Sequence, residues 1–223
     1  MDGKATGVGR PRASGAAASR QDAREAVLDA AGELFTGAGY AATTTRAIAE
    51  RAGLRQASLY YHFPAKEDIL AELLAATVRP SLAVAVGLVS APSPEPASVR
   101  LWALAYADVR LLGGARHNIG ALYLLPEVSS PNLAGFRADR AELKAAYGAL
   151  VAAAGQGVSA IRTDLVFGLV ESTAITRRDD PALDVEAHAR EAADAVVRLA
   201  GLGEPDDTLR AAARALLAGA GRT

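Results

Sequence analysis

Hydrophobic residues recur three and four positions apart through most of the chain, which is the spacing of one face of an α-helix. The first such run starts near Ser19, where "SRQD" offers a capping serine, and continues to about Thr36. Its apolar positions are Val27, Ala31, Leu34 and Phe35. Glycines at 37 and 39 suit the C-terminus of a helix, so a first helix is predicted over this run.

Two short helices are predicted next, and a tight turn separates them. The first runs from Thr44 or Thr45 to Arg51 with a threonine as its N-cap, and the second covers residues 56–62. Gly53 lies in the "AGL" turn between them, where a small residue permits close approach of the helices. By spacing alone, a helix-turn-helix and an ordinary helical hairpin fit this segment about equally well.

A fourth helix is predicted from Pro64, and it is expected to end before Pro80 because proline disfavours helical geometry in the residue before it. The segment "SAPSPEPAS" then predicts a linker or turn. Later apolar helical stretches are predicted over 97–113, 116–125, 133–154, 160–177, 184–201 and 206–219. No stretch shows a convincing strand pattern, so the predicted fold class is all-α.

Composition agrees with a helical globular protein and excludes several kinds of chemistry. Hydrophobic residues make up 51% of the 223 residues, and charged residues 22%. The chain has no cysteine, which excludes disulfides, thiol nucleophiles and cysteine-ligated zinc. No run approaches the roughly 20 apolar residues of a membrane helix, and the N-terminus lacks the apolar stretch of a signal peptide. A cytoplasmic protein with no membrane association is therefore expected.

Charge is unevenly distributed along the chain. Residues 1–66 carry nine Lys and Arg against six Asp and Glu, whereas the whole chain has a formal net charge of −1. A basic N-terminal part on an acidic body favours a polyanion as partner. Residues 1–18 show no hydrophobic period and are expected to form a flexible basic arm. Its "GRPR" stretch at 9–12 either enters a minor groove or remains a solvated tail that raises the local concentration of cations.

The second short helix has an apolar and a polar side. At about 100° per residue, Leu59 and Phe63 share one side, where they can pack on the two preceding helices. Ala57 and Tyr61 lie on the opposite side. The apolar residues therefore account for the packing of this helix, whereas packing does not explain the polar residues.

The polar residues around this helix have side chains that suit DNA. Glutamine can bond an adenine edge twice, arginine can bond guanine, and alanine or an aromatic ring can contact a thymine methyl group. Residues of these types on the outer face or at its entry are Arg55, Gln56, Ala57, Ser58 and Tyr61. Side chains that suit phosphate oxygens are Thr45, Arg46, Tyr60, His62 and Lys66. Different residues are thus suited to contacts with bases and to contacts with the DNA backbone.

Residues 43–70, "TTTRAIAERAGLRQASLYYHFPAKEDIL", resemble the DNA-binding motif of the tetracycline repressor (TetR) family of transcriptional regulators. The threonine pair before "RAIA", the "AG" turn, the "LYYHF" ending and the lysine after Pro64 carry the resemblance, which is strong over about residues 20–75. It implies a three-helix DNA-binding domain at 19–66 and a larger helical domain at 67–223 that binds a ligand and dimerises.

The resemblance also implies a role for each polar residue of the motif. Those implied to lie against bases are Gln56, Ala57, Ser58 and Tyr61, with Arg55 at a base or a phosphate. Those implied to hold the DNA backbone are Thr45, Arg46, Tyr60, His62 and Lys66. Many members of the family have glycine at the position of Ala57, where this chain therefore favours a methyl contact.

Sparse aromatic residues of the larger domain are candidates to line the effector pocket that the resemblance implies. The ligand-binding candidates are Trp102, Tyr106, Tyr123, Phe136, Tyr147 and Phe167, with the polar side chains Arg110, His117 and Glu171. The first two and Arg110 follow at four-residue spacing and can share a face. A single aromatic residue on a helix is more often ordinary core, so the group is better supported than its members.

Two polar interruptions of this domain have alternative interpretations. Residues 116–118 either bind an acidic or hydroxylated effector or cap a helix after the Gly113–Gly114 break. Residues 171–173 belong either to a pocket or to a dimer contact. The resemblance favours the dimer contact, because 160–177 and 184–201 match the pair of helices that family members use to form a four-helix interface.

Neither a metal site nor catalysis is predicted. His188, Glu191 and Asp194 fall on one helical face, but no further His or Cys lies near them, and a solvated or interfacial face is favoured. The chain lacks G-x-S-x-G, a complete G-x-G-x-x-G and a P-loop, so an enzyme is disfavoured and no cofactor is expected.

The sequence therefore predicts a ligand-responsive transcriptional regulator. We expect a homodimeric repressor that binds a near-palindromic operator in double-stranded DNA and is released by a small-molecule effector. Two-fold symmetry would place its recognition helices in successive major grooves, about 34–36 Å apart or a larger multiple. The alternatives are a helical small-molecule-binding protein and a transcriptional activator without a repressor role.

Overall fold

The computed structural model describes residues 13–89, 94–153 and 159–220, and throughout these ranges the regular structure is helical. Its α-helices are α1 (Ala13–Gly37), α2 (Thr45–Arg51), α3 (Gln56–His62), α4 (Lys66–Val89), α5 (Ala97–Gly114), α6 (Ala134–Val151), α7 (Ala160–Glu171), α8 (Thr173–Asp179), α9 (Val185–Leu199) and α10 (Asp207–Ala220). The 3₁₀ helices η1 (Ile119–Leu124), η2 (Pro126–Ser129) and η3 (Pro131–Leu133) join α5 to α6. The predicted all-α fold is confirmed.

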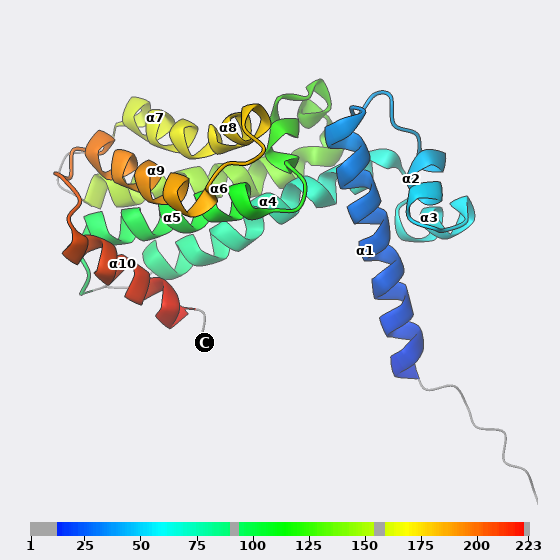
Figure 1. Ribbon diagram of the computed structural model, residues 1–223, viewed down its shortest axis with the longest axis horizontal. Helices are drawn as coiled ribbons and strands as arrows, with labels where there is room; N and C mark the ends of the chain where they lie inside the picture. Colours follow the sequence, from blue (N-terminus) through cyan, green and yellow to red (C-terminus); the bar gives the residue numbers. More distant parts are fainter. Residues whose placement is uncertain (1–12, 90–93, 154–158, 221–223) are drawn as a thin grey trace, which may run out of the picture.

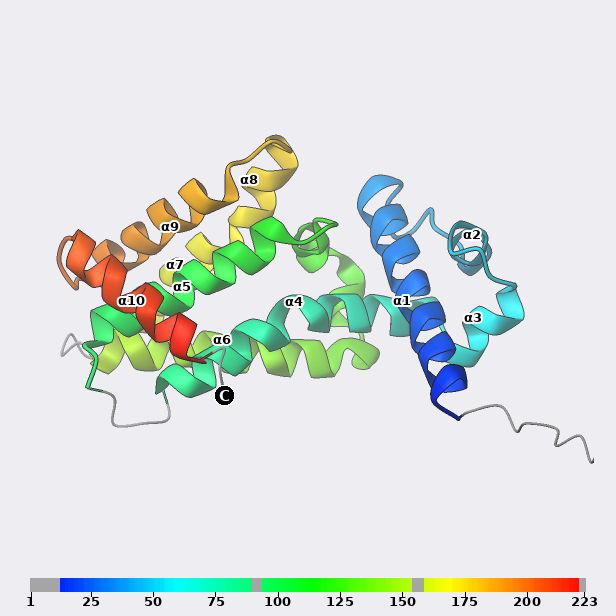
Figure 2. The same ribbon diagram turned by 60° about the horizontal axis from the view of Figure 1, so that its bottom comes forward.

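The helices form a small group and a larger one (Figure 1 and Figure 2). Helices α1, α2 and α3 lie together at one end of the molecule, and α4 runs from them into the larger group. Helix α5 packs against α4, α6, α9 and α10, so it lies at the centre of the larger group. Its residues Leu101, Trp102 and Leu104 have no exposed surface, as expected for a central helix.

The first helix is longer than the sequence predicted. It begins at Ala13, whereas the prediction placed residues up to 18 in a flexible arm and the helix start near Ser19. The added segment reads "ASGAAA", and alanine has the highest helix propensity of any residue, so these positions extend the helix that follows. The "GRPR" stretch at 9–12 lies outside the described residues.

The predicted end of the fourth helix before Pro80 is wrong. Helix α4 continues through Pro80 to Val89. An internal proline removes one backbone hydrogen bond and costs about 3 kcal/mol. Here Pro80 is exposed, while Ser81, Ala85 and Leu88 beyond it are buried against the larger group. Burying one large apolar side chain contributes about 1.5–3 kcal/mol, so packing beyond the proline is sufficient to keep the helix going.

Helix α4 is also the one described helix that is long and apolar enough to cross a membrane. Half of its apolar stretch is buried inside the protein, and it packs against α5 and α6. These contacts are those of a core helix in a globular protein.

Two other predicted helical stretches have a different form. The stretch at 116–125 forms the 3₁₀ helix η1, and the stretch at 160–177 is divided into α7 and α8. Ser172 lies at the division, where its hydroxyl donates to the carbonyl of Leu169 at 2.6 Å. Serine and threonine hydroxyls that bond back to the preceding turn weaken and bend helices, which accounts for the break.

Candidate nucleic-acid interface

Helix α2 is capped at both ends by local interactions. The Thr44 side chain accepts a hydrogen bond from the Ala47 N–H at 3.1 Å, which confirms the predicted threonine cap. At the other end Leu54 N donates to Ala49 O at 2.9 Å and Gly53 N to Glu50 O at 3.2 Å, the two bonds of a Schellman motif. These bonds set the direction in which the chain leaves α2 and enters α3.

Gly53 is needed for its backbone angle and not for space. Its φ is +69°, in the left-handed region that glycine adopts without strain. A β-carbon at this position would meet nothing within 4 Å, so the expectation that Gly53 permits close helix approach is wrong. The turn requires glycine because any side chain would strain the backbone there.

Helix α3 presents one side to the core and the other to solvent, as predicted. Leu59 is fully buried and Phe63 is 3% exposed, and both join the buried cluster that contains Phe35 and Ile48. Tyr61 on the opposite side is 71% exposed. The exposed residues on this side and at its entry are Arg55, Gln56, Ala57, Tyr60 and Tyr61. Ser58 and His62 are partly buried at its margins.

Three of the predicted DNA contacts are hydrogen-bonded to one another. The Thr45 hydroxyl lies 3.0 Å from the Tyr60 hydroxyl, and Gln56 Nε2 donates to Thr45 Oγ1 at 3.4 Å. This cluster joins the start of α2 to the exposed face of α3. It therefore holds a base-reading candidate and two backbone candidates in a fixed relation before any DNA is present.

The basic residues Arg46 and Lys66 differ in exposure and in the partners that they already bind. Arg46 is exposed and pairs with Glu50 one turn later, at 2.8 Å. Lys66 is partly buried, and its ammonium donates to the carbonyl oxygens of Tyr40 and Thr43, each at 2.8 Å. The ammonium also lies 4.1 Å from the centre of the Tyr40 ring. Lys66 therefore ties the start of α4 to the loop before α2, a role that local sequence patterns do not reveal.

Tyr40 is the residue of this region that the sequence analysis missed. Its ring is 7% exposed and packs edge-on against Phe35, with the ring centres 4.9 Å apart. Burial, followed by the negative charge of Glu67, raises the pKa of its hydroxyl to about 12. The signal in the sequence is an aromatic residue directly after Gly39, just beyond the end of α1. Its contact with Lys66 depends on two distant segments meeting.

Of the predicted ligand candidates on α5, Trp102 and Tyr106 lie in the core and Arg110 is exposed. The rings of Trp102 and Tyr106 stack with their centres 4.7 Å apart, and the Arg110 guanidinium lies 5.5 Å from the Tyr106 ring, so the three share a face as predicted. Trp102 is fully buried and donates through Nε1 to Asp194 at 2.7 Å. This contact fastens α5 to α9.

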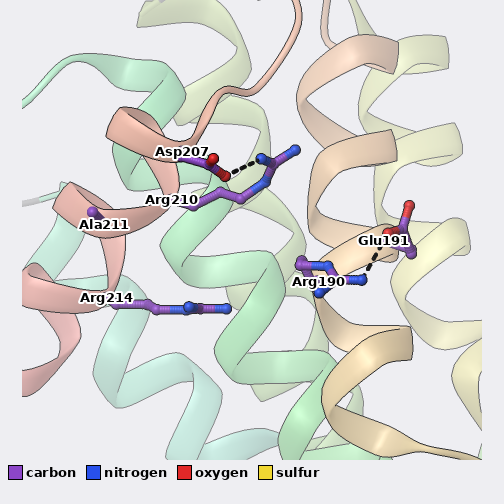
Figure 3. Close-up of a pocket in the computed structure, with 6 residues that line it drawn as sticks. All are labelled: Arg190, Glu191, Asp207, Arg210, Ala211 and Arg214. Carbon is purple, nitrogen blue, oxygen red and sulfur yellow. Dashed lines mark hydrogen bonds and ion pairs between the residues drawn. The ribbon is translucent and has the colours of Figure 1, made fainter.

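An open groove of about 530 Å³ beside this contact is rich in charge (Figure 3). Its lining residues are Arg190, Glu191, Asp207, Arg210, Ala211 and Arg214. Arg210 pairs with Asp207 at 2.9 Å and with the buried Asp194 at 2.6 Å, and Arg190 pairs with Glu191 at 3.2 Å. Of these pairs, the one between Arg210 and Asp194 joins α10 to α9, and each of the other two lies within a single helix.

Other ligand candidates border two cavities that share Gly120. A cavity of about 260 Å³ lies between η1 and the α7–α8 division, and Tyr123 and Glu171 help to line it. A cavity of about 120 Å³ on the other side of Gly120 is lined in part by His117. The structure thus brings three of the candidates to this region, whereas Phe136, Tyr147 and Phe167 are buried core residues.

Two sets of hydrogen-bonded polar side chains lie in the larger group of helices, one buried and one partly buried. Asp108 of α5 is 3% exposed and accepts hydrogen bonds from Ser81 at 2.7 Å and from Tyr147 at 3.0 Å. Glu171 accepts two hydrogen bonds from Arg140, at 2.5 and 2.6 Å. Sequence reasoning missed Asp108, Ser81 and Arg140, because nothing local distinguishes them from exposed polar residues of a helix.

The two short helices, the glycine turn and the polar exposed face of α3 define a helix-turn-helix protein, the class that places its second helix in a DNA major groove. Residues 27–73 match the family model described as bacterial regulatory proteins, tetR family. The crystal structure of AmtR from Mycobacterium smegmatis is 45% identical, with a TM-score of 0.80 and a match that covers 87% of this chain and 94% of that chain. The chain therefore belongs to the tetR family of bacterial regulatory proteins.

More distant similarities agree with this assignment. The HTH-type transcriptional repressor KstR2 from Rhodococcus jostii (strain RHA1) is 47% identical over 51 residues. The match covers 23% of this chain and only 25% of the length of that protein. The crystal structure of FadR from Bacillus subtilis in complex with stearoyl-CoA is 22% identical, covers 78% of this chain and 97% of that chain, and has a TM-score of 0.56. The latter similarity shows a common fold.

Proposed function

We propose that the protein is a homodimeric transcriptional repressor that binds a near-palindromic operator and is released when a small molecule binds its helical domain. The observation that carries the proposal is the exposed face of α3, where polar and aromatic side chains are presented to solvent while Leu59 and Phe63 anchor the helix. A glutamine and a tyrosine on a solvent-facing recognition helix have the chemistry for base edges.

The residues of this face have separate roles in the proposal. Gln56, Ala57, Ser58 and Tyr61 read bases, and Arg55 contacts a base or a phosphate. The DNA backbone is held by Thr45, Arg46, Tyr60, His62 and Lys66. The hydrogen bond between Thr45 and Tyr60 and the one that Gln56 donates to Thr45 support a preformed surface, which loses less side-chain entropy when it binds.

Dimerisation is proposed through α7, α8 and α9. Exposed apolar side chains lie on α7 and α8, where Ile161 is 75%, Leu165 54% and Ile175 48% exposed. Large exposed apolar side chains that lie close together on a surface are typical of a protein contact, and Ile161 and Leu165, four residues apart, share one face of α7. The occupant proposed here is the same surface of a second copy, as two-fold symmetry requires.

The proposed effector site is the cavity between η1 and the α7–α8 division. Its lining is mostly apolar, with Tyr123, Glu171, Ser172 and Arg178 as polar side chains. Its volume of about 260 Å³ favours a small, largely apolar molecule. The carboxylate of Glu171 already binds Arg140, and the guanidinium of Arg178 already binds Asp179, so the polar groups of the lining suit hydrogen bonding more than charge pairing.

Selection of bound duplexes from a random pool tests DNA recognition. We expect the wild-type protein to enrich a near-palindromic sequence, and Gln56→Ala or Tyr61→Ala to change the preferred bases. Glu142→Ala is the matched control, because Glu142 is exposed on α6, away from the interface. A wild-type protein that shows no sequence preference would contradict the proposal.

Sedimentation tests the dimer. We expect the wild-type protein to sediment as a dimer at micromolar concentration and Leu165→Asp to sediment as a monomer. Val86→Asp places the same charge at another exposed apolar position, on α4, and should leave the dimer intact. A wild-type monomer would exclude the symmetric operator.

A further inference from the structure

Segment 115–118, which joins α5 to η1, lies directly against α1 of the DNA-binding helices. Arg116 Nη1 donates to Asp29 Oδ2 at 2.7 Å, and His117 Nε2 lies 2.9 Å from Asp29 Oδ1. The His117 ring also covers Gly32, where a β-carbon would lie 2.8 Å from the ring atom Cδ2. Polar bonds and close packing thus join α1 to this segment with no space between them.

Helix α8 holds the same segment from the other side. The guanidinium of Arg177 donates to the carbonyl oxygens of residues 112, 115, 116 and 117. These carbonyls include the C-terminal end of α5, where the helix dipole favours a positive charge. Asn118 Nδ2 also donates to Ala174 O of α8, at 2.7 Å. A movement of α8 therefore pulls on segment 115–118 through several hydrogen bonds at once.

The proposed effector cavity borders this connection. Gly120 of η1 and Ala174 of α8 both line the cavity, and a β-carbon at Gly120 would lie 2.9 Å from the Ala174 Cβ. Helix α8 and η1 are therefore in tight contact at the cavity wall. Any group that enters between them must move one of them.

We propose that segment 115–118 couples the effector cavity to the DNA-binding helices, with Arg177 as the positioning residue and Asp29 as the point of contact on α1. This inference rests on the proposed function, because it describes how that same cavity regulates DNA binding. Displacement of α1 carries α2 and α3 with it, since α1 packs against both. A different route runs through α4, where Arg24 of α1 pairs with Glu72 at 3.1 Å.

A methyl group at Gly120 tests the coupling without any effector. The Gly120→Ala variant places a β-carbon against Ala174 and separates η1 from α8. Its affinity is measured for the duplex that the wild-type protein selects from a random pool. We expect Gly120→Ala to weaken binding about fivefold or more, in the range of allosteric couplings. In an Asp29→Ala or Arg177→Gln background, the same methyl group should change the affinity less than about twofold.

Two control variants separate this route from general damage. Ala174→Gly removes the β-carbon that the methyl group meets, so the double variant Gly120→Ala with Ala174→Gly should recover most of the wild-type affinity. Glu72→Ala breaks the ion pair between α1 and α4, and in that background Gly120→Ala should still weaken binding about fivefold. Thermal unfolding of each variant establishes that the protein is folded at the temperature at which DNA affinity is measured.

Each outcome has a separate meaning. If the wild-type protein selects no duplex, the proposed function fails. If it selects a duplex but Gly120→Ala weakens binding equally with and without Asp29, the coupling through segment 115–118 is refuted while DNA recognition stands. It is also refuted if folded Gly120→Ala binds like the wild type, or if Glu72→Ala removes the effect and Asp29→Ala does not.

Discussion

Replacing Asp108 by asparagine should make the stability of the protein less sensitive to pH. Asp108 is buried between α4, α5 and α6, with hydrogen bonds from Ser81 and Tyr147. Burial raises the pKa of its carboxyl group from 3.8 to about 6, because the loss of hydration outweighs the two hydrogen bonds that favour the charged form. The folded state therefore holds this proton more tightly than the unfolded chain does.

The sign of the effect follows from proton linkage. Between about pH 4 and pH 6 the folded state binds more protons at Asp108 than the unfolded state, so the free energy of unfolding falls as pH rises through this window. Each pKa unit corresponds to about 1.4 kcal/mol. Between about pH 4.5 and pH 7.5 the wild-type protein should therefore lose about 2 kcal/mol that Asp108→Asn does not lose.

Urea unfolding of both proteins at these two pH values measures the difference. Asparagine keeps the shape of the side chain and can still accept a hydrogen bond, so the variant should fold. Asp22→Asn is the control, because Asp22 is exposed on α1. A free energy of unfolding that changes equally with pH in the wild-type protein and in Asp108→Asn would refute the raised pKa.

Three further predictions concern the DNA-binding helices. Gly32→Ala should lower both stability and DNA affinity, because its β-carbon meets the His117 ring. Gly37→Ala on the same helix is the control, because its β-carbon meets nothing within 4 Å and should change neither property. Thermal unfolding measures the stability of the two variants, and DNA titration measures their affinity. Gly53→Ala should lower the free energy of unfolding by about 1–2 kcal/mol in a urea titration, because its φ of +69° strains any side chain; a loss no greater than that of Gly37→Ala would contradict this reasoning. Lys66→Ala should weaken binding to all duplexes and lower the salt slope by about 1 if the ammonium contacts phosphate; an unchanged slope would assign Lys66 to its two carbonyl partners alone.

Local signals in the sequence were enough to predict two short helices and the turn between them, and the resemblance to the TetR family then favoured a helix-turn-helix over an ordinary helical hairpin. The bounds of α2 and α3 and the inward side of Leu59 and Phe63 are confirmed. These features depend on interactions within a few residues: a threonine that caps the next turn, a glycine at the left-handed end of a helix, and apolar residues one turn apart. Such signals are present in the chain before it folds, so they can be read without knowing its tertiary contacts.

For the candidate site residues, the sequence predicted which side chains are exposed but not which partners they bind. The outward position of Tyr61 followed from helical spacing, but the hydrogen bonds that join Thr45 to Tyr60 and Gln56 did not. Among the ligand candidates, Trp102 was chosen as an aromatic residue, yet its fully buried indole bonds to Asp194, which lies 92 positions away. Residue type alone does not distinguish a cavity wall from a core.

The sequence by itself determined the all-helical class, the presence of the three N-terminal helices α1, α2 and α3, and the side of α3 that faces solvent. Only the tertiary structure decided that α4 continues through Pro80, since packing of distant helices outweighs the local cost of proline. It also decided that Asp29, His117 and Arg177 meet across three segments. Contacts of this kind depend on how helices pack against one another, and the periodicity of one helix carries no information about its neighbour.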